Sequence, residues 1–249
     1  MKNTEMFYDE ISAWYDNMVN FDEAVKKRES ALNSFINKKM KNAVDIGCGT
    51  GIDSIALARC GMNVTAFDIS AQMIKQAKKK SEDCGVDITF IQCSAEEIPA
   101  IYNDKFHLAV SLGNTLANIP GHQLINSIKK IFDVMQNDGV FILQILNYAR
   151  ILRMQERIVN ITRNGDYYYT RFYDFTGEEI NFNILRFHAG NPSDRSLRTS
   201  VIYPYDYKYL VDVIKSAGFS EIKLWGSLNR TAFSHETSSD LLIEAKKII

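Results

Sequence analysis

One stretch constrains the fold of this chain more than any other: Ala43 to Gly51, an apolar run that ends in three glycines with one residue between each. The residues after it, from Ile52 to Ala58, predict a helix. Strand, glycine turn and helix is how an α/β fold brings its backbone close to a ligand. Glycine adopts positive φ and lacks the Cβ that would block that approach. The stretch therefore predicts an α/β fold that binds a nucleotide-like ligand at this turn.

The glycine spacing narrows the choice of ligand. A dinucleotide fingerprint would need glycine at position 52, where the chain has Ile52. The observed spacing, with an acid two residues before the first glycine, resembles instead the first motif of class I S-adenosylmethionine (SAM)-dependent methyltransferases. This resemblance implies that SAM is the cofactor and S-adenosylhomocysteine its product. It places these residues at the cofactor: Asp45, Gly47, Cys48, Gly49 and Gly51.

A second acid follows the next expected strand, Met62 to Phe67. Asp68 lies 17 residues after Gly51, near the ~20 expected of an acid that binds ribose. Its two oxygens can accept both ribose hydroxyls. Ile69 and Met73, at the start of a helix expected over 70–83, are predicted to cover the adenine face.

Two further turns complete the predicted cofactor site. After a strand at Asp87 to Gln92, the turn of Ser94, Ala95 and Glu96 is predicted to lie at the adenine edge. The resemblance implies an acid there that bonds the adenine amino group, and Ser94 stands in its place. Ser111 and Leu112, at the end of a strand over 105–112, are expected to contact the cofactor as well.

The N-terminal region predicts two helices, over 4–19 and about 22–40, from its apolar spacing. The phrase from Tyr8 to Asp16 resembles the N-terminal segment of many small-molecule methyltransferases. That resemblance implies a segment that folds over the cofactor, with the hydroxyl of Tyr15 reaching it. Arg28 is the predicted partner of the SAM carboxylate.

The methyl acceptor is expected beyond the carboxyl ends of the strands, where open α/β sheets bind ligands. Ser111 to Asn118 resembles the Leu-Gly-Asn loop of the glycine N-methyltransferase family, which includes glycine/sarcosine enzymes; Asn147-Tyr148 and Tyr203-Pro204 match two of its other motifs. The resemblance places Asn114 near the acceptor amine. Tyr148 and Tyr203 are the other residues expected to hold the acceptor, so these three are the predicted catalytic residues.

Two departures from that family bear on the substrate. The family has an arginine before Asn-Tyr that holds a carboxylate, and this chain has Leu146. A histidine of the Leu-Gly-Asn loop is Asn118 here. We therefore expect transfer by in-line attack to a nitrogen or oxygen of a small molecule, but not to glycine. His107, His188 and His235 are candidate bases, and none is favoured over the others.

The resemblance to class I methyltransferases implies a Rossmann-like, seven-stranded, mostly parallel sheet in the order 3-2-1-4-5-7-6, with its last strand antiparallel. A helix is expected over 121–136, a fifth strand over 140–146, a helix over 206–217 and the last strands over 221–226 and 239–246. Three antiparallel strands, over 166–175, 179–188 and 196–203, interrupt this rhythm. The expected domains are a core of 1–156 and 205–249, including an N-terminal helical cap of 1–40, and an inserted β lid of 157–204 over the substrate site.

The composition of the chain indicates which kinds of partner and which cellular setting to expect. The 29 basic and 30 acidic residues give a net charge of −1, which argues against a nucleic-acid partner. The absence of an apolar run of ~18 residues argues against a membrane span. The four cysteines have no metal-ligand spacing, so we expect no metal and a reducing, cytoplasmic setting. A monomer or small homo-oligomer is expected.

Two alternatives stay open: a SAM-binding protein without catalysis, and a methyltransferase that acts on a macromolecule. A third, an NAD-dependent oxidoreductase, is disfavoured by the glycine spacing, since Ile52 breaks the dinucleotide fingerprint.

Overall fold

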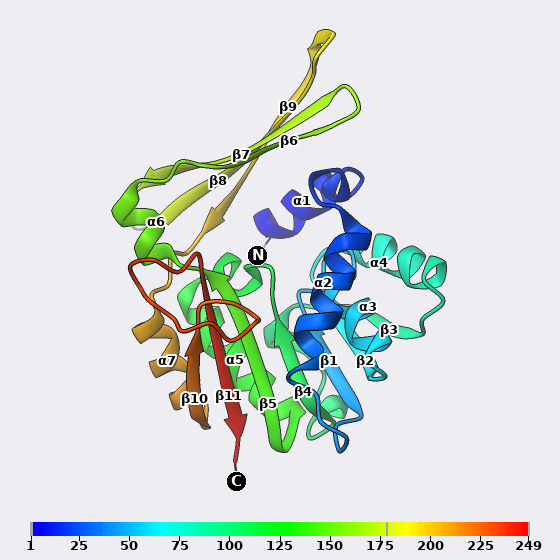
Figure 1. The fold of residues 1–249 in the computed structure, drawn as a ribbon, viewed down its shortest axis with the longest axis vertical. Helices are drawn as coiled ribbons and strands as arrows, with labels where there is room; N and C mark the ends of the chain where they lie inside the picture. The colour runs from blue at the N-terminus through cyan, green and yellow to red at the C-terminus, as the bar shows by residue number, and fades with distance from the viewer. Residues whose placement is uncertain (1, 178, 249) are drawn as a thin grey trace.

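A seven-stranded sheet and a separate four-stranded sheet organise the chain (Figure 1). The structure, a computed structural model, describes residues 2–177 and 179–248. The order of the larger sheet is β10-β11-β5-β4-β1-β2-β3, which confirms the predicted order. Its strands are β1 (Asn42–Ile46), β2 (Asn63–Asp68), β3 (Ile88–Gln92), β4 (Phe106–Ser111), β5 (Met135–Leu146), β10 (Phe219–Trp225) and β11 (Asp240–Lys247). Strand β11 runs antiparallel to both β5 and β10, as predicted for the last strand.

Helices cover both faces of the larger sheet because its strands are apolar on both sides. In β1, Val44 packs in the cluster that includes α5 (Gly121–Val134) and α7 (Tyr207–Ser216). Its neighbour Ala43 packs in the cluster that includes α2 (Phe21–Asn33) and α3 (Ile52–Arg59). The helices are α1 (Lys2–Ile11), α2 (Phe21–Asn33), α3 (Ile52–Arg59), α4 (Ala71–Asp83), α5 (Gly121–Val134), α6 (Tyr148–Met154) and α7 (Tyr207–Ser216). Short 3-10 turns occur at Tyr15–Met18, Ala95–Glu97, Ala100–Tyr102 and Thr115–Asn118. No helix of the described chain is long and apolar enough to cross a membrane.

The smaller sheet, called the lid below, consists of β6 (Ile158–Asn164), β7 (Tyr167–Thr176), β8 (Glu179–His188) and β9 (Asn191–Ile202), paired in that order and antiparallel. Three of these strands were predicted, and β6 was not. Strand β6 pairs only with β7 and is mostly exposed, so its sequence has no buried alternation to reveal it.

The lid lies across the end of the core, with α1 beneath it (Figure 1). Phe7 and Ile11 of α1 pack in one cluster with Tyr169 of β7, Ile184 of β8 and Met73 of α4. The N-terminal helix therefore joins the lid to the helix that follows β2.

The predicted helix over 4–19 is wrong in its second half. Helix α1 ends at Ile11, where the Ser12 hydroxyl donates a 2.9 Å hydrogen bond to the carbonyl of Asp9. The chain then turns, and a 3-10 turn begins at Tyr15. Because of this break, neighbouring aromatic residues point to different places: Trp14 packs on Tyr169 with ring centroids 5.6 Å apart, while Tyr15 lines the cavity described below.

Other boundaries differ for similar reasons. Helix α2 ends at Asn33 rather than near 40, because Phe35 and Met40 enter the core on the way to β1. Strand β5 begins at Met135, and the expected turn at 137–139 is an irregularity inside it, where the register with β4 shifts. Helix α6 was not predicted; Asn147 caps it by accepting a bond from the Arg150 amide.

Candidate functional site

A cavity of about 510 Å³ lies at the carboxyl ends of β1, β2 and β4. The glycine turn, the N-terminal segment and the lid all line it. These parts are far apart in sequence and meet because parallel strands end at one edge of a sheet. The cavity is therefore the place where a ligand of the glycine turn would lie beside a second substrate.

Two glycines of the turn have different roles. A Cβ on Gly47 would lie 2.1 Å from Thr115 Cγ2, so this glycine lets the loop after β4 pack against the turn. A Cβ on Gly49 would meet no atom within 4 Å. Both have positive φ, +76° and +54°. The ligand argument from sequence thus applies to Gly49, whereas Gly47 is required by the protein's own packing.

Asp68 is held in place from behind by the backbone. Its Oδ2 accepts the Gly49 amide at 2.7 Å, and its Oδ1 accepts the Ser70 amide at 2.9 Å. Burial raises the pKa of Asp68 to about 6, although these amide bonds act in the opposite direction. Each carboxylate oxygen can accept a further hydrogen bond, so the group suits a ligand with two adjacent hydroxyls.

Two more carboxyl groups lie around the turn. Asp45 accepts a 2.6 Å bond from the Ser54 hydroxyl and does not line the cavity; burial, reinforced by nearby Asp53, raises its pKa well above the usual range. Asp53 lines the cavity and forms a 3.0 Å ion pair with Arg28. Arg28 thus faces the cavity already partnered, and any ligand carboxylate would share it with Asp53.

The segment after α1 is fastened to the glycine turn. The Thr50 hydroxyl donates a 2.8 Å bond to Asp16, whose carboxylate also pairs with Lys80 of α4. The adjacent Tyr15 lines the cavity. Burial raises the pKa of Tyr15 and that of Tyr8, whose hydroxyl donates to Asn118 at 3.3 Å, so both phenols stay neutral.

Asn114 occupies the loop after β4 with φ +70°. Its Oδ1 accepts the Leu146 amide at 3.0 Å, and its Nδ2 donates to the Tyr148 hydroxyl at 2.6 Å. The Tyr148 hydroxyl is also hydrogen-bonded to that of Tyr173 in the lid. Both ends of the Asn114 amide are thus fixed, and its loop is tied to the lid through two tyrosines.

The lid contributes a mixed wall to the cavity. Arg171 and Tyr173 of β7 face it, with the apolar Phe182 and Ile184 of β8 beside them. Burial raises the pKa of Tyr173 to about 12, so this phenol is neutral at physiological pH. The lid therefore offers one guanidinium, one neutral hydroxyl and apolar surface.

The structure brings most of the predicted residues together. Those that line the cavity are Tyr15, Arg28, Gly47, Cys48, Gly49, Asp68, Ile69, Met73, Ser94, Ala95, Leu112 and Asn114. Those outside its lining are Asp45, Gly51, Glu96, Ser111, Tyr148 and Tyr203. Gly51 caps α3 and the Ser111 hydroxyl bonds the Ile46 carbonyl, so these two support the turn. Tyr203 stacks on Tyr205 outside the cavity, so we give it no part in holding an acceptor.

Ser94, predicted at the adenine edge, donates a 2.5 Å bond to the carboxylate of Glu97. The hydroxyl is thus already committed to a neighbour within its own turn. An adenine amino group would meet this turn with the Ser94 oxygen as an acceptor.

Several residues that line the cavity were not predicted from the sequence, and most of them belong to the lid or the N-terminal segment. The cavity also includes Tyr8, Thr50, Asp53, Gln144, Val159, Arg171, Tyr173, Phe182 and Ile184. Thr50 and Asp53 adjoin the glycine motif and could have been found from it. The lid residues could not, because nothing local in a polar, aromatic strand says which of its faces meets the core.

No histidine or metal cluster marks the site. Within residues 2–177 and 179–248, no three His, Cys, Asp or Glu side chains are arranged to hold a metal ion. The candidate bases His107, His188 and His235 do not line the cavity; His107 accepts the Asn42 amide at the start of β4.

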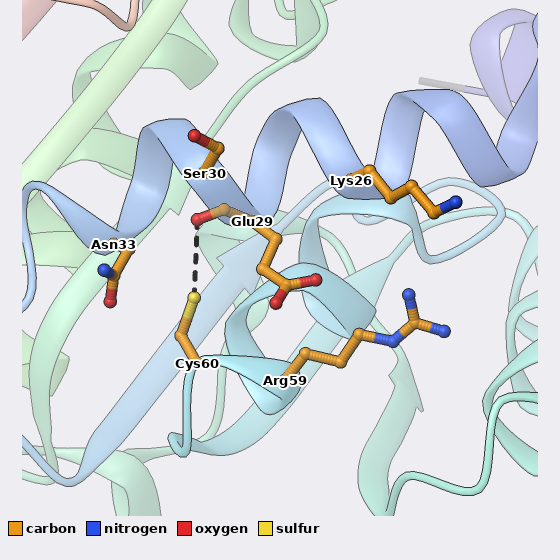
Figure 2. Close-up of a pocket in the computed structure, with 6 residues that line it drawn as sticks. All are labelled: Lys26, Glu29, Ser30, Asn33, Arg59 and Cys60. Atoms are coloured by element: carbon orange, nitrogen blue, oxygen red, sulfur yellow. Dashed lines mark hydrogen bonds between the residues drawn. The ribbon is translucent and has the colours of Figure 1, made fainter.

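A second hollow lies on the surface between α2 and α3, lined by Lys26, Glu29, Ser30, Asn33, Arg59 and Cys60 (Figure 2). Figure 2 draws one hydrogen bond between the lining residues, from the Cys60 thiol to the Glu29 carbonyl at 3.5 Å. None of its residues belongs to the cavity at the glycine turn. We therefore place the candidate site in the larger cavity.

Comparison with known proteins finds similarity to methyltransferases. The family model described as "Methyltransferase domain" matches residues 43–139, from β1 into β5. A carboxy-S-adenosyl-L-methionine synthase of Nautilia profundicola is 25% identical over 225 residues, covering 88% of each chain. A glycine/sarcosine N-methyltransferase of Aphanothece halophytica is 22% identical and covers 95% of this chain and 87% of the relative.

A solved structure repeats the fold. An S-adenosylmethionine-dependent methyltransferase from Clostridium acetobutylicum superposes with a TM-score of 0.80 at 17% identity, covering 97% of this chain and 99% of that one. The similarity extends through the lid as well as the core, since nearly all of both chains align. That methyltransferase is S-adenosylmethionine-dependent, the glycine spacing of this chain indicates the same molecule, and the matched family model is that of a methyltransferase domain. The cofactor is therefore S-adenosylmethionine.

Proposed function

We propose that this chain, a class I SAM-dependent methyltransferase, transfers the methyl group of SAM by in-line displacement to a nitrogen or oxygen of a small molecule. The observation that supports this most directly is the single cavity lined by both the glycine turn and the lid. An acceptor must enter that same space to reach the methyl group. An enclosed space favours a small substrate over a nucleic-acid or protein chain.

Asp68 and the turn would hold the nucleoside part of SAM. The fixed carboxylate of Asp68 accepts the two ribose hydroxyls, and the open side of Gly49 leaves room for the chain of the cofactor. Ile69 and Met73 cover the adenine, with Ser94 and Ala95 at its edge. Arg28, shared with Asp53, lies where the SAM carboxylate would reach the N-terminal segment.

Asn114 and its neighbours would position the acceptor. The Asn114 amide is clamped between the Leu146 backbone and Tyr148, so its loop keeps one conformation. Tyr148 is buried behind this loop and acts as a positioning residue. Tyr15 closes the cavity from the N-terminal side because Asp16 is tied to Thr50.

The chemistry demands little from side chains. The bound cofactor supplies an activated methyl group on a sulfonium. The lone pair of the acceptor atom would form the bond to the methyl carbon as the carbon–sulfur bond breaks, and the electron pair of that broken bond would stay on sulfur in S-adenosylhomocysteine. An amine acceptor loses its proton to water. The chain's own contribution is alignment and exclusion of water, which can supply a large part of the rate enhancement.

The names of relatives support a small acceptor without naming it. They include a glycine/sarcosine N-methyltransferase and a ubiquinone biosynthesis O-methyltransferase of Actinobacillus pleuropneumoniae. Both nitrogen and oxygen acceptors are thus represented among proteins similar to this chain. Leu146, which lines the cavity, stands where the glycine N-methyltransferase family has an arginine for the glycine carboxylate, so this position does not bind glycine as that family does.

A labelled-donor assay tests the proposal. The protein is incubated with methyl-labelled SAM and a panel of small amines, phenols and carboxylates, and separately with a cell extract divided into small molecules, protein and nucleic acid. Label should enter one or more small molecules. Asp68→Asn should abolish transfer at low SAM concentration, and Asp87→Asn, an exposed aspartate just before β3, is the matched control.

Other outcomes separate the alternatives. Label only in the protein or nucleic-acid fraction would replace the small acceptor by a macromolecule. SAM binding measured by calorimetry, with no label in any fraction, would leave a SAM-binding protein without catalysis.

A further inference from the structure

Arg171 differs from the other arginines of the lid. Arg157, Arg163, Arg186 and Arg198 each pair with a carboxylate, and Arg195 is exposed to solvent. Arg171 faces the cavity, and within the described residues it forms no ion pair. Its one hydrogen bond runs from Nε to the Asn160 side chain on β6, at 2.6 Å.

That hydrogen bond leaves the outer edge of the guanidinium free. Nε is used to orient the side chain, while the two terminal nitrogens have no protein partner in the described structure. Those two nitrogens form the planar fork that matches an oxyanion in a bidentate contact. The hydrogen bond to Asn160 thus orients the guanidinium so that its two terminal nitrogens are available to bind an anion in the cavity.

The environment makes this cation costly without an anion. Burial lowers the pKa of Arg171, and the groups that act on it are the hydroxyls of Tyr15 and Tyr173, both neutral. The two carboxylates of the cavity are engaged elsewhere: Asp53 with Arg28, and Asp68 with backbone amides. A half-buried charge without a counter-charge is unfavourable, so the site is completed by a ligand that brings one.

The position of Arg171 places that anion on the acceptor rather than on SAM. Tyr173, two residues along β7 and on the same face, bonds to Tyr148, which bonds to Asn114. Arg171 therefore stands beside the residues proposed to position the acceptor. Arg28, on the other side of the glycine turn, is the cation available to the SAM carboxylate.

We propose that Arg171 binds an oxyanion, a carboxylate or a phosphate, on the methyl acceptor, so that the enzyme selects anionic small molecules. This rests on the proposed function, because it specifies the second substrate of the same cavity. The oxyanion sits against the guanidinium fork, and the nucleophilic nitrogen or oxygen of the same molecule points toward Asn114.

The test compares matched acceptors and matched arginines. Amines that carry a carboxylate or a phosphonate are compared with their neutral amides and esters, using methyl-labelled SAM. The variants are Arg171→Gln and, as the control, Arg195→Gln, which removes an exposed arginine of the same sheet. Anionic acceptors should be preferred, and Arg171→Gln should raise their KM by ~10- to 100-fold, the effect of losing charged hydrogen bonds. The carboxylate and phosphonate arms decide between the two oxyanions.

The SAM dissociation constant, measured by calorimetry, should be unchanged in Arg171→Gln. A weakened SAM affinity would show that Arg171 binds the cofactor carboxylate and would overturn the proposal. Equal use of neutral and anionic acceptors, unchanged by Arg171→Gln, would overturn it while leaving methyl transfer to small molecules intact. No transfer to any compound would instead contradict the proposed function. Arg171→Lys keeps the charge but lacks the two-pronged guanidinium, so its KM for anionic acceptors should lie between those of the wild type and Arg171→Gln. This variant replaces Arg171→Gln in the test if the Gln variant melts at a lower temperature.

Discussion

The hydroxyl of Thr50, in the glycine turn, donates a 2.8 Å hydrogen bond to the carboxylate of Asp16, in the N-terminal segment. Lys80 of α4 pairs with the same carboxylate. This one acid links the cofactor turn to the segment that carries Tyr15 into the cavity. The closure of the cavity on the N-terminal side thus depends on a contact between residues 34 positions apart.

Removing the hydrogen bond between Thr50 and Asp16 should lower the affinity for SAM and have a smaller effect on the free energy of unfolding. Thr50→Val keeps the buried volume but loses the hydroxyl, so Asp16 and Tyr15 are no longer fastened to the turn. We expect the SAM dissociation constant to rise about 5- to 10-fold, the effect of one charge-assisted hydrogen bond. Calorimetry measures it, with Thr89→Val, exposed on β3, as control. An affinity equal to that of the wild type would show that the N-terminal segment closes without this bond.

SAM affinity should depend on the ionisation of Asp68. Its pKa is about 6 in the folded protein, and its ionised form is the better acceptor for ribose hydroxyls. Affinity should therefore rise as pH increases through about 6 and then level off. Asp68→Asn should bind weakly and lose this pH dependence. A wild-type profile that is flat between about pH 5 and 7 would contradict the assignment of Asp68.

The same shift has an opposite consequence for the free protein. Because burial raises the folded pKa of Asp68 above its unfolded value, the folded state binds more protons between about pH 4 and 6. The contribution of Asp68 to the free energy of unfolding therefore falls as pH rises across that range. Urea unfolding at several pH values should show a smaller loss in Asp68→Asn than in the wild type. An equal loss of unfolding free energy in the two proteins would show that groups other than Asp68 cause the pH dependence.

Tyr148 should affect the acceptor and not the cofactor. Tyr148→Phe removes the hydroxyl that accepts from Asn114 and bonds to Tyr173, and leaves the partly buried Asn114 Nδ2 without this partner. We expect the unfolding free energy to fall by about 1–2 kcal/mol and kcat/KM for the acceptor to fall about 10-fold, with SAM affinity unchanged. Tyr203→Phe, outside the cavity, is the matched control. An equal fall in kcat/KM in both variants would show that Tyr148 has no specific role in positioning the acceptor.

The two glycines should separate packing from ligand binding. Gly47→Ala drives a methyl group against Thr115 at a positive φ and should cost about 2–4 kcal/mol of stability. Gly49→Ala has open space beyond its Cβ and should cost only about 1–2 kcal/mol while lowering SAM affinity. Thermal melting and calorimetry measure both effects. Adding Thr115→Ala should restore part of the stability of Gly47→Ala; no recovery would mean that backbone strain, not the contact, is the cost.

Local pattern predicted the core well because each of its elements has a clear signal. The positions of the seven strands and the acid at the end of β2 follow from apolar runs and turn residues, whereas the order of the strands in the sheet was implied by the resemblance to methyltransferases. Predictions failed where the signal was nonlocal. The helix over 4–19 breaks at Ile11 since its aromatic residues serve two different partners, and β6 is stabilised by pairing rather than by burial.

The candidate site divides in the same way. Gly47, Gly49 and Asp68 lie within 22 residues of one another, so one supersecondary unit fixes their geometry. Their spacing carries the resemblance to methyltransferases that indicated SAM. The acceptor side is built from the loop at Asn114 and the lid strand of Arg171, which no periodicity connects. The sequence by itself determined the fold of the core and the methyl donor. Only the tertiary structure decided which face of the lid meets the cavity, because strand pairing and long-range packing, rather than local propensity, set that face.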